Sequence, residues 1–220
     1  MTITKIEKQK RGSGFNIYIE NGFLFSIYSQ KSIVDADLYT GKILSSQMVK
    51  EISKTDLFNY FLDRIMGLLS RRPRSTKEIS DYLYKNLKSK ISKKNLSENL
   101  YEELTKDIIE YLKEKNYIND IEFTKFWVNA RKNSKSKRIL FQELVSKGIS
   151  RSIIELEIGK IKDSIEKGAA LKIADKKIKL LTKYDRITKD KKLKEFLYRK
   201  GYNWEIIKEI TAEILDKEPF

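Results

Sequence analysis

The sequence predicts a mainly α fold: a small N-terminal β segment followed by three tandem three-helix repeats, stacked as an elongated, curved array. Hydrophobic residues alternate at a period of two early in the chain and change to helical spacing near residue 46. Only two prolines and nine glycines occur in 220 residues, which disfavours a loop-rich all-β fold. In the C-terminal half, hydrophobic positions coincide when the chain is shifted by 53 residues, as expected for repeats.

The β segment is predicted from two alternating runs, residues 15–20 and 23–28, on either side of Asn21-Gly22. This dipeptide favours a two-residue type I′ hairpin turn, because both of its residues tolerate positive φ. Residues 5–11 are expected to form a third strand, which ends in a turn at residues 12–14. A phosphate-binding nest is the alternative for this glycine-containing turn, but no helix signal follows it.

Helix boundaries are marked by capping residues. Ser75 and Glu78 form a capping-box pattern for one helix, and Asn119-Asp120 begins another. Between them, a lysine-rich stretch at residues 85–94 is expected to be a connector rather than a helix. Glycines 148 and 201 are expected to end two further helices, because glycine adopts left-handed geometry at low cost.

The 53-residue shift places Leu140, Leu144 and Gly148 on Leu193, Leu197 and Gly201, and a shift of 61 extends the pattern towards Ile79 and Leu83. A three-helix unit of this size buries its apolar face poorly alone, so we expect stacking to create one continuous core. The expected parts are an N-terminal β-hairpin region at residues 1–50 and helical repeats at residues 54–118, 119–166 and 168–217.

The net charge predicts an acidic partner. Lysine and arginine number 46 and aspartate and glutamate 31, which gives +15 spread along the whole chain. Nucleic acid, a nucleoprotein or an acidic protein surface would each fit this charge, and the alternative is a lysine-biased, well-solvated surface. No segment approaches the roughly 20 apolar residues of a membrane span, and residues 1–7 lack a signal-peptide core. We expect a cytoplasmic monomer without membrane contact.

Basic residues recur between the first and second helices of each expected repeat. Because the clusters occupy matched positions, we favour a positive track that binds phosphates or carboxylates over a solvated turn that tolerates charge. The candidate partner-binding residues are Arg71, Arg72 and Arg74 in repeat one; Arg131, Lys132, Lys135, Lys137 and Arg138 in repeat two; and Lys183, Arg186, Lys189, Lys191 and Lys192 in repeat three, together with Arg199 and Lys200 later in that repeat.

Aromatic residues admit two interpretations. Side chains such as Phe126, Trp127 and Tyr198 could stack on unpaired bases, but their helical spacing beside aliphatic residues favours core packing. Tyr202 and Trp204 follow the end of a helix, so we expect these two to be the surface exceptions.

Signals of catalysis are weak. The chain has no cysteine and no histidine, which excludes thiolate nucleophiles, Ser-His-Asp triads and imidazole bases. A lysine base, or carboxylates that hold Mg²⁺, would remain possible. Glu102, Glu103, Asp107 and Glu110 share helical spacing, but this pattern also describes an ordinary polar face, which we favour. We expect a non-enzymatic protein without catalytic residues, metal or cofactor.

Five motifs in order resemble those of the RecX family, bacterial regulators of the RecA recombinase. They are a leader at Leu38–Leu44, an R-x-x-S-x-x-E/D pattern at Arg72–Glu78, a Y-I-N-D segment at Tyr117–Asp120, an E-L-x-x-K-G-I signature at Glu143–Ile149 and an L-x-R-K-G-Y segment at Leu197–Tyr202. The sequence departs from the family at Asn116 and at Ser134–Ser136, where glycine is usual.

The resemblance implies a non-enzymatic modulator that lies in the groove of the RecA filament on single-stranded DNA. It also implies inhibition of the ATPase and strand-exchange activities of RecA. Weak binding of single- or double-stranded DNA without sequence preference is expected from the charge. The alternative is a general, nonspecific DNA-binding helical protein without a recombinase partner.

Overall fold

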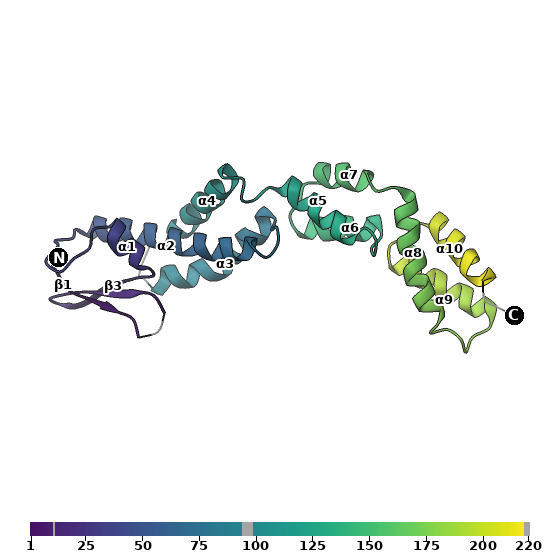
Figure 1. The fold of residues 1–220 in the computed structure, drawn as a ribbon, viewed down its shortest axis with the longest axis horizontal. Helices are drawn as coiled ribbons and strands as arrows, with labels where there is room; N and C mark the ends of the chain where they lie inside the picture. The colour runs from purple at the N-terminus through teal and green to yellow at the C-terminus, as the bar shows by residue number, and fades with distance from the viewer. Residues whose placement is uncertain (11, 94–98, 218–220) are drawn as a thin grey trace. The chain divides into compact units, whose positions relative to one another are not determined.

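The structure is a computed structural model that describes residues 1–10, 12–93 and 99–217 (Figure 1). The chain divides into two units, residues 1–118 and 119–220, each with its own hydrophobic interior. Among the described residues, the first unit holds three strands and four helices, and the second holds six helices. The prediction of a mainly α fold with a small N-terminal β segment is therefore confirmed.

The N-terminal strands form an antiparallel sheet in the order β1 (Ile3–Lys8), β2 (Phe15–Ile19) and β3 (Gly22–Ile27). The hairpin predicted around Asn21-Gly22 is present, but the predicted type I′ turn is wrong. Ile19 pairs with Gly22, and Gly22 has a φ of +108° whereas Asn21 does not have a positive φ. This geometry matches a turn in which a single left-handed glycine follows the two turn residues. The strand expected at residues 5–11 is β1, which begins and ends earlier, at Ile3 and Lys8. Arg11 lies outside the described residues.

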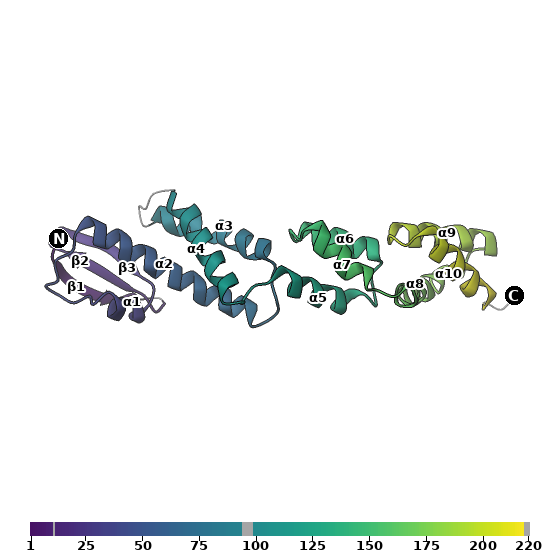
Figure 2. The same ribbon diagram turned by 90° about the horizontal axis from the view of Figure 1, so that it is seen from above.

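Two helices lie on one side of the sheet: α1 (Gln30–Asp35) and α2 (Ser46–Leu69) (Figure 1; Figure 2). The first half of α2 packs Met48, Val49 and Ile52 against the buried face of the sheet. Its second half contributes Leu57 and Phe61 to the next core. One continuous helix thus crosses residues 50–54, where the sequence placed the division between β segment and repeat one.

A buried carboxylate fastens the sheet to α2. Asp56 is fully buried, and its two carboxylate oxygens accept from the backbone N–H of Tyr28 at 3.0 and 3.1 Å. The ring of Tyr28 lies 4.2 Å from that of Tyr60, and the ammonium of Lys90 is 4.7 Å from the Tyr28 ring centre. Burial, with smaller contributions from Tyr60 and Asp56, raises the pKa of Tyr28 to about 12.

Repeat one comprises α2, α3 (Thr76–Lys93) and α4 (Asn99–Glu114). The capping box is confirmed: Ser75 Oγ accepts from the Glu78 N–H at 3.1 Å, and Glu78 accepts from the Ser75 N–H at 3.3 Å. The prediction of a connector at residues 85–94 is wrong as far as Lys93, because α3 continues through it and buries Leu87 and Ile91. Lys94 lies outside the described residues.

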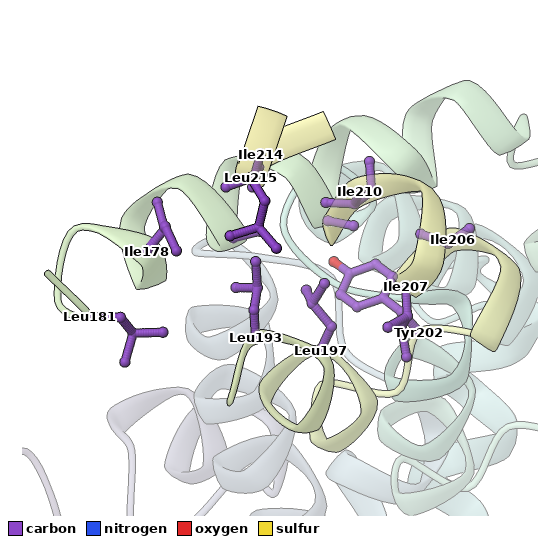
Figure 3. Close-up of a cluster of buried hydrophobic side chains, with 12 residues drawn as sticks. Ile178, Leu181, Leu193, Leu197, Tyr202, Ile206, Ile207, Ile210, Ile214 and Leu215 are labelled. Atoms are coloured by element: carbon purple, nitrogen blue, oxygen red, sulfur yellow. The ribbon is translucent and has the colours of Figure 1, made fainter. Parts of the chain in front are cut away.

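The second unit contains two further helix triplets. Repeat two comprises α5 (Asp120–Arg131), α6 (Lys137–Ser146) and α7 (Arg151–Gly159). Repeat three comprises α8 (Asp163–Ile178), α9 (Arg186–Arg199) and α10 (Trp204–Asp216). Figure 3 shows the core of repeat three, where the ring of Tyr202 lies beside Leu197 and Ile207.

The expected continuous core is wrong within this unit. Repeats two and three bury two separate hydrophobic clusters, one around Leu140 and Leu144 and the other around Leu193 and Leu197. Ile165 of α8 packs against the repeat-two cluster, and the rest of the join described below is polar. Stacking of these two repeats therefore depends on specific hydrogen bonds and ion pairs as well as on apolar burial.

The two predicted glycines follow helix ends, as expected. Gly148 and Gly201 have φ of +77° and +82°, and they follow the ends of α6 and α9. After α4, Asn116 adopts a φ of +54°, so asparagine takes the left-handed geometry at the position where the RecX motif usually has glycine.

Candidate binding surface

The predicted basic clusters lie in or near the loop between the first and second helices of each repeat, except that Arg199 and Lys200 lie at the C-terminal end of α9. The loops span residues 70–75 in repeat one, 132–136 in repeat two and 179–185 in repeat three. Although the sequence positions match, the side chains of the three clusters have different partners. Some cations are held by carboxylates of the same unit, and others are open to solvent.

In repeat one, Arg72 is held by an internal contact, and we call cations of this kind committed. Its two terminal nitrogens donate to the two carboxylate oxygens of Glu78 at 3.0 and 2.9 Å. These hydrogen bonds raise the pKa of Arg72, which keeps the guanidinium charged. The same Glu78 completes the capping box of α3, so this bidentate pair fixes the loop. Arg74 is half-buried, and its Nε has no hydrogen-bond partner among the described residues, whereas Arg71 is exposed.

In repeat two, Arg131 is also committed. Its guanidinium donates to Glu143 at 2.7 Å and lies 4.9 Å from the ring centre of Trp127. Trp127 in turn donates its indole N–H to the other oxygen of Glu143 at 2.9 Å. The glutamate of the E-L-x-x-K-G-I signature therefore ties α5 to α6. This arrangement gives Glu143 a structural role that the sequence pattern did not reveal.

Lys137 belongs to a polar seam between repeats two and three. Its backbone N–H donates to Glu166 at 2.9 Å, and its ammonium lies 2.8 Å from Asp163. The hydrogen bond from Lys137 lowers the pKa of Asp163. Both carboxylates lie in the first turn of α8, whereas Lys137 is the first residue of α6.

Ser136 completes this seam, which we define as Ser136, Lys137, Asp163, Glu166 and the Lys200-Gly201 turn. The Ser136 side chain is fully buried, accepts from the Ile139 N–H at 3.3 Å and lies 2.8 Å from the Lys200 carbonyl, to which it donates. A Cβ added to Gly201 would lie 2.8 Å from Ser136 Oγ. Repeat two therefore docks its loop directly on the turn that ends α9.

In repeat three, Arg186 pairs with Asp216 at 2.7 Å and thereby joins the start of α9 to the end of α10. Two lysines cover aromatic rings: Lys192 lies 4.7 Å from the centre of Tyr184, and Lys200 lies 5.5 Å from that of Phe196. Lys189 is half-buried on α9. Lys132, in repeat two, donates to Asn129 at 2.8 Å.

Seven predicted residues have no ion pair, side-chain hydrogen bond or ring contact with any other described residue: the half-buried Arg74 and six further cations. We call these six the open cations: Arg71, Lys135, Arg138, Lys183, Lys191 and Arg199. Three of the six belong to repeat three. Local sequence reasoning could not separate them from the committed cations, because the carboxylates Asp163, Glu166 and Asp216 are distant in sequence.

The aromatic predictions are partly wrong. Tyr202 is buried in the core of repeat three, whereas Trp204 is exposed as expected. Tyr198 and Phe126, which we expected in the core, are exposed. Burial, followed by the charge of Glu166, raises the pKa of Tyr202 to about 12. Its hydroxyl has no hydrogen-bond partner among the described residues.

The acidic residues of α4 serve a structural contact, since Glu103 and Asp107 hold the ammonium of Lys54 at 2.5 and 3.0 Å. In the described part of the chain, no three carboxylates gather in a way that could hold a metal ion. The residues that the structure describes also include no helix that is both long and apolar enough to cross a bilayer.

The fold and this surface define a class: a basic protein of three-helix repeats joined to a small sheet, with cations at the loops after the first helices. The family profile "Regulatory protein RecX N-terminal domain" matches residues 1–45, and "RecX, third three-helix domain" matches residues 166–211. A protein of Listeria welshimeri named "Regulatory protein RecX" is 30% identical over 97% of this chain and 76% of its own length. The chain belongs to the RecX family.

Further similarities agree with this assignment. A Clostridium perfringens protein of the same name is 28% identical over 98% of this chain and 97% of its own length. A crystal structure of regulatory protein RecX superimposes with a TM-score of 0.62 at 22% identity, covering 96% of this chain and 98% of its own. The crystal structure of RecX from Lactobacillus salivarius gives a TM-score of 0.56 at 24% identity, covering 74% and 98%. At these identities the two structures support the fold.

Proposed function

We propose that this protein binds the RecA recombinase filament on single-stranded DNA and, without catalysis of its own, lowers ATP hydrolysis and strand exchange by RecA. Membership of the RecX family carries this proposal, because the resemblance of the motifs implies a regulator of RecA. The net charge of +15 supports it independently, since a filament on DNA presents phosphates and carboxylates.

The open cations are the side chains best suited to this contact. Lys183, Lys191 and Arg199 can reach an anionic partner without first breaking an internal ion pair. Contacts from more than one repeat would act together, so several weak sites would give useful overall affinity. Arg72, Arg131 and Lys137 support this surface indirectly, because their internal contacts hold the loops in place.

The same cations would bind free DNA weakly and without sequence preference. Phosphate contacts of this kind give dissociation constants of roughly 10⁻⁴–10⁻⁶ M at physiological salt, and binding weakens steeply as salt rises. We therefore expect the filament, rather than bare DNA, to be the preferred partner, because the filament adds protein contacts to the phosphates.

The central experiment measures ATP hydrolysis by the cognate RecA on single-stranded DNA with increasing amounts of this protein. We expect the rate to fall at substoichiometric levels. An unchanged rate with the protein in excess would contradict the proposal.

A charge-reversal variant tests the open cations. The triple change Lys183→Glu, Lys191→Glu and Arg199→Glu should weaken filament binding by about tenfold or more, because it places like charges against an anionic partner. The control changes the exposed residues Lys10, Lys50 and Lys88 to glutamate. Each Lys→Glu or Arg→Glu change lowers the net charge by 2, so each triple variant has a net charge of +9 instead of +15. Equal loss of binding in the two variants would show that only overall charge matters.

A further inference from the structure

The loop between α8 and α9, residues 179–185, projects beyond the ends of its helices (Figure 1). Leu180 at its start is 75% exposed, and Ile187 in the first turn of α9 is 81% exposed. These are the two most exposed large hydrophobic side chains in the described part of the chain. Tyr184 between them is also exposed. Three large apolar side chains exposed within eight residues mark this segment as a candidate interaction site.

The corresponding loop of repeat two indicates what such a loop binds. There, Ser136 and Lys137 dock on protein: the serine donates to the carbonyl of Lys200, and the lysine binds the carboxylates of Asp163 and Glu166. The end of the repeat-two loop and the first residue of α6 therefore already dock, within this chain, on a surface that carries two carboxylates.

Charge at the α8–α9 loop fits a partner of the same kind. Lys179, Lys183 and Lys191 are exposed around the apolar residues, and within the described ranges none of them has a carboxylate partner. Of the acidic groups in this stretch, Asp190 pairs with Lys194 at 2.6 Å, whereas Asp185 is exposed at the N-cap of α9. An apolar centre surrounded by cations complements an apolar pocket with carboxylates at its rim.

Nucleic acid fits this loop less well. Leucine and isoleucine neither stack on bases as aromatic rings do nor pair with phosphates. One face of the Tyr184 ring is already covered by the ammonium of Lys192, at 4.7 Å from the ring centre. The loop also lacks the amphipathic helix that binds proteins to lipid surfaces.

We propose that the α8–α9 loop is a protein-docking element, in which Leu180 and Ile187 enter an apolar pocket on the partner and the surrounding lysines bind carboxylates at its rim. This inference rests on the proposed function, because it assigns the pocket to the recombinase filament. It deepens that function by separating a protein contact from the contacts with phosphate.

The test compares the double variant Leu180→Ser and Ile187→Ser with a matched control, Val34→Ser and Ile43→Ser. The control residues are 70% and 72% exposed, so both variants remove two similarly exposed aliphatic side chains. Binding is measured on RecA-coated single-stranded DNA and, separately, on bare single-stranded and duplex DNA. Circular dichroism verifies that each variant is folded.

The loop variant should bind the filament at least about tenfold more weakly, because truncated apolar anchors at an interface commonly have effects of this size. Its binding to bare DNA and the filament binding of the control should not change. A conservative variant, Leu180→Met with Ile187→Leu, should keep wild-type affinity because it keeps the apolar surface.

Wild-type affinity of the Leu180→Ser and Ile187→Ser variant for the filament would overturn the inference while leaving the proposed function intact. A parallel loss on bare DNA would overturn it as well, because the loop would then contact nucleic acid. If the wild-type protein itself does not bind the filament, the proposed function fails first and the inference fails with it.

Discussion

The loops after the first helix of repeats two and three occupy matched positions but have opposite surroundings. In repeat two the loop is polar, and it ends at a buried serine that donates to the carbonyl of Lys200. In repeat three the loop exposes Leu180 and Tyr184. The clusters beside these loops also differ, because Arg131 and Lys137 are held by carboxylates while Lys183 and Lys191 are open.

This difference shows that a basic residue at a repeated position has no fixed role. Arg131 and Lys183 contribute the same charge to the sequence, but only Arg131 has a carboxylate and an aromatic ring within reach. A substitution at Arg131 should therefore affect folding, and one at Lys183 should affect binding. Three predictions test this comparison.

The largest effect is expected at the turn on which the repeat-two loop docks. Gly201→Ala should lower the free energy of unfolding by about 3 kcal/mol, because alanine is strained at a φ of +82° and its Cβ would lie 2.8 Å from Ser136 Oγ. Urea denaturation followed by circular dichroism measures the change.

The double variant Ser136→Ala with Gly201→Ala provides the control for this prediction. Removal of the serine oxygen relieves the close contact but not the strain of positive φ, so the two changes should cost less together than the sum of their separate effects. Strict additivity would mean that the seam does not form as described.

A smaller effect is expected when the same charge reversal is made in the two repeats. Arg131→Glu should lower the free energy of unfolding by about 2 kcal/mol, since it removes the contact with Trp127 and places a second carboxylate beside Glu143. Lys183→Glu should change this free energy by less than about 0.5 kcal/mol. Equal stabilities of the two variants, from chemical denaturation, would remove the distinction between committed and open cations.

The smallest effect concerns Tyr202, which is buried beside the seam. Its pKa of about 12 means that folding favours the neutral phenol, whereas the unfolded chain releases this proton near pH 10. Its contribution to stability is therefore complete below pH 10 and is lost as the pH rises from 10 to 12. Tyr202→Phe should show a shallower loss of stability over this range.

At neutral pH the Tyr202→Phe variant should be as stable as the wild type, or up to about 1 kcal/mol more stable, because the hydroxyl has no hydrogen-bond partner among the described residues. Denaturation at pH 7 and at several values between 10 and 12 provides the measurement. Identical pH profiles of the two proteins would argue that the phenol is solvated rather than buried. Tyr28, whose pKa is also about 12, is present in both and cancels in the comparison.

Local patterns in the sequence predicted much of the fold. The capping box at Ser75 and the cap at Asn119 were read from short motifs, because capping depends on residues within one turn of each other. The connector prediction was wrong at residues 85–93, although Leu83, Leu87 and Ile91 recur every four residues and are buried. In that stretch, frequent lysines obscured an apolar stripe that the helix α3 uses.

The candidate site was less predictable. The sequence located the basic clusters, but it could not identify which cations are held by Glu78, Glu143 and Asp163, because partner choice depends on how helices pack. Tyr202 was expected at the surface because it follows a helix end, but the left-handed turn at Gly201 precedes it and its ring packs beside Leu197 in the core.

By itself, the sequence determined the class of fold, the helix caps, the left-handed glycines and the positive charge, because each of these depends on residue type and on neighbours a few positions away. Only the tertiary structure decided which charges are available to a partner. An ion pair such as Arg186 with Asp216 joins residues 30 positions apart, so it exists only after α9 and α10 have packed. Apolar exposure at Leu180 and Ile187 was decided in the same way, because burial depends on which neighbours reach a side chain.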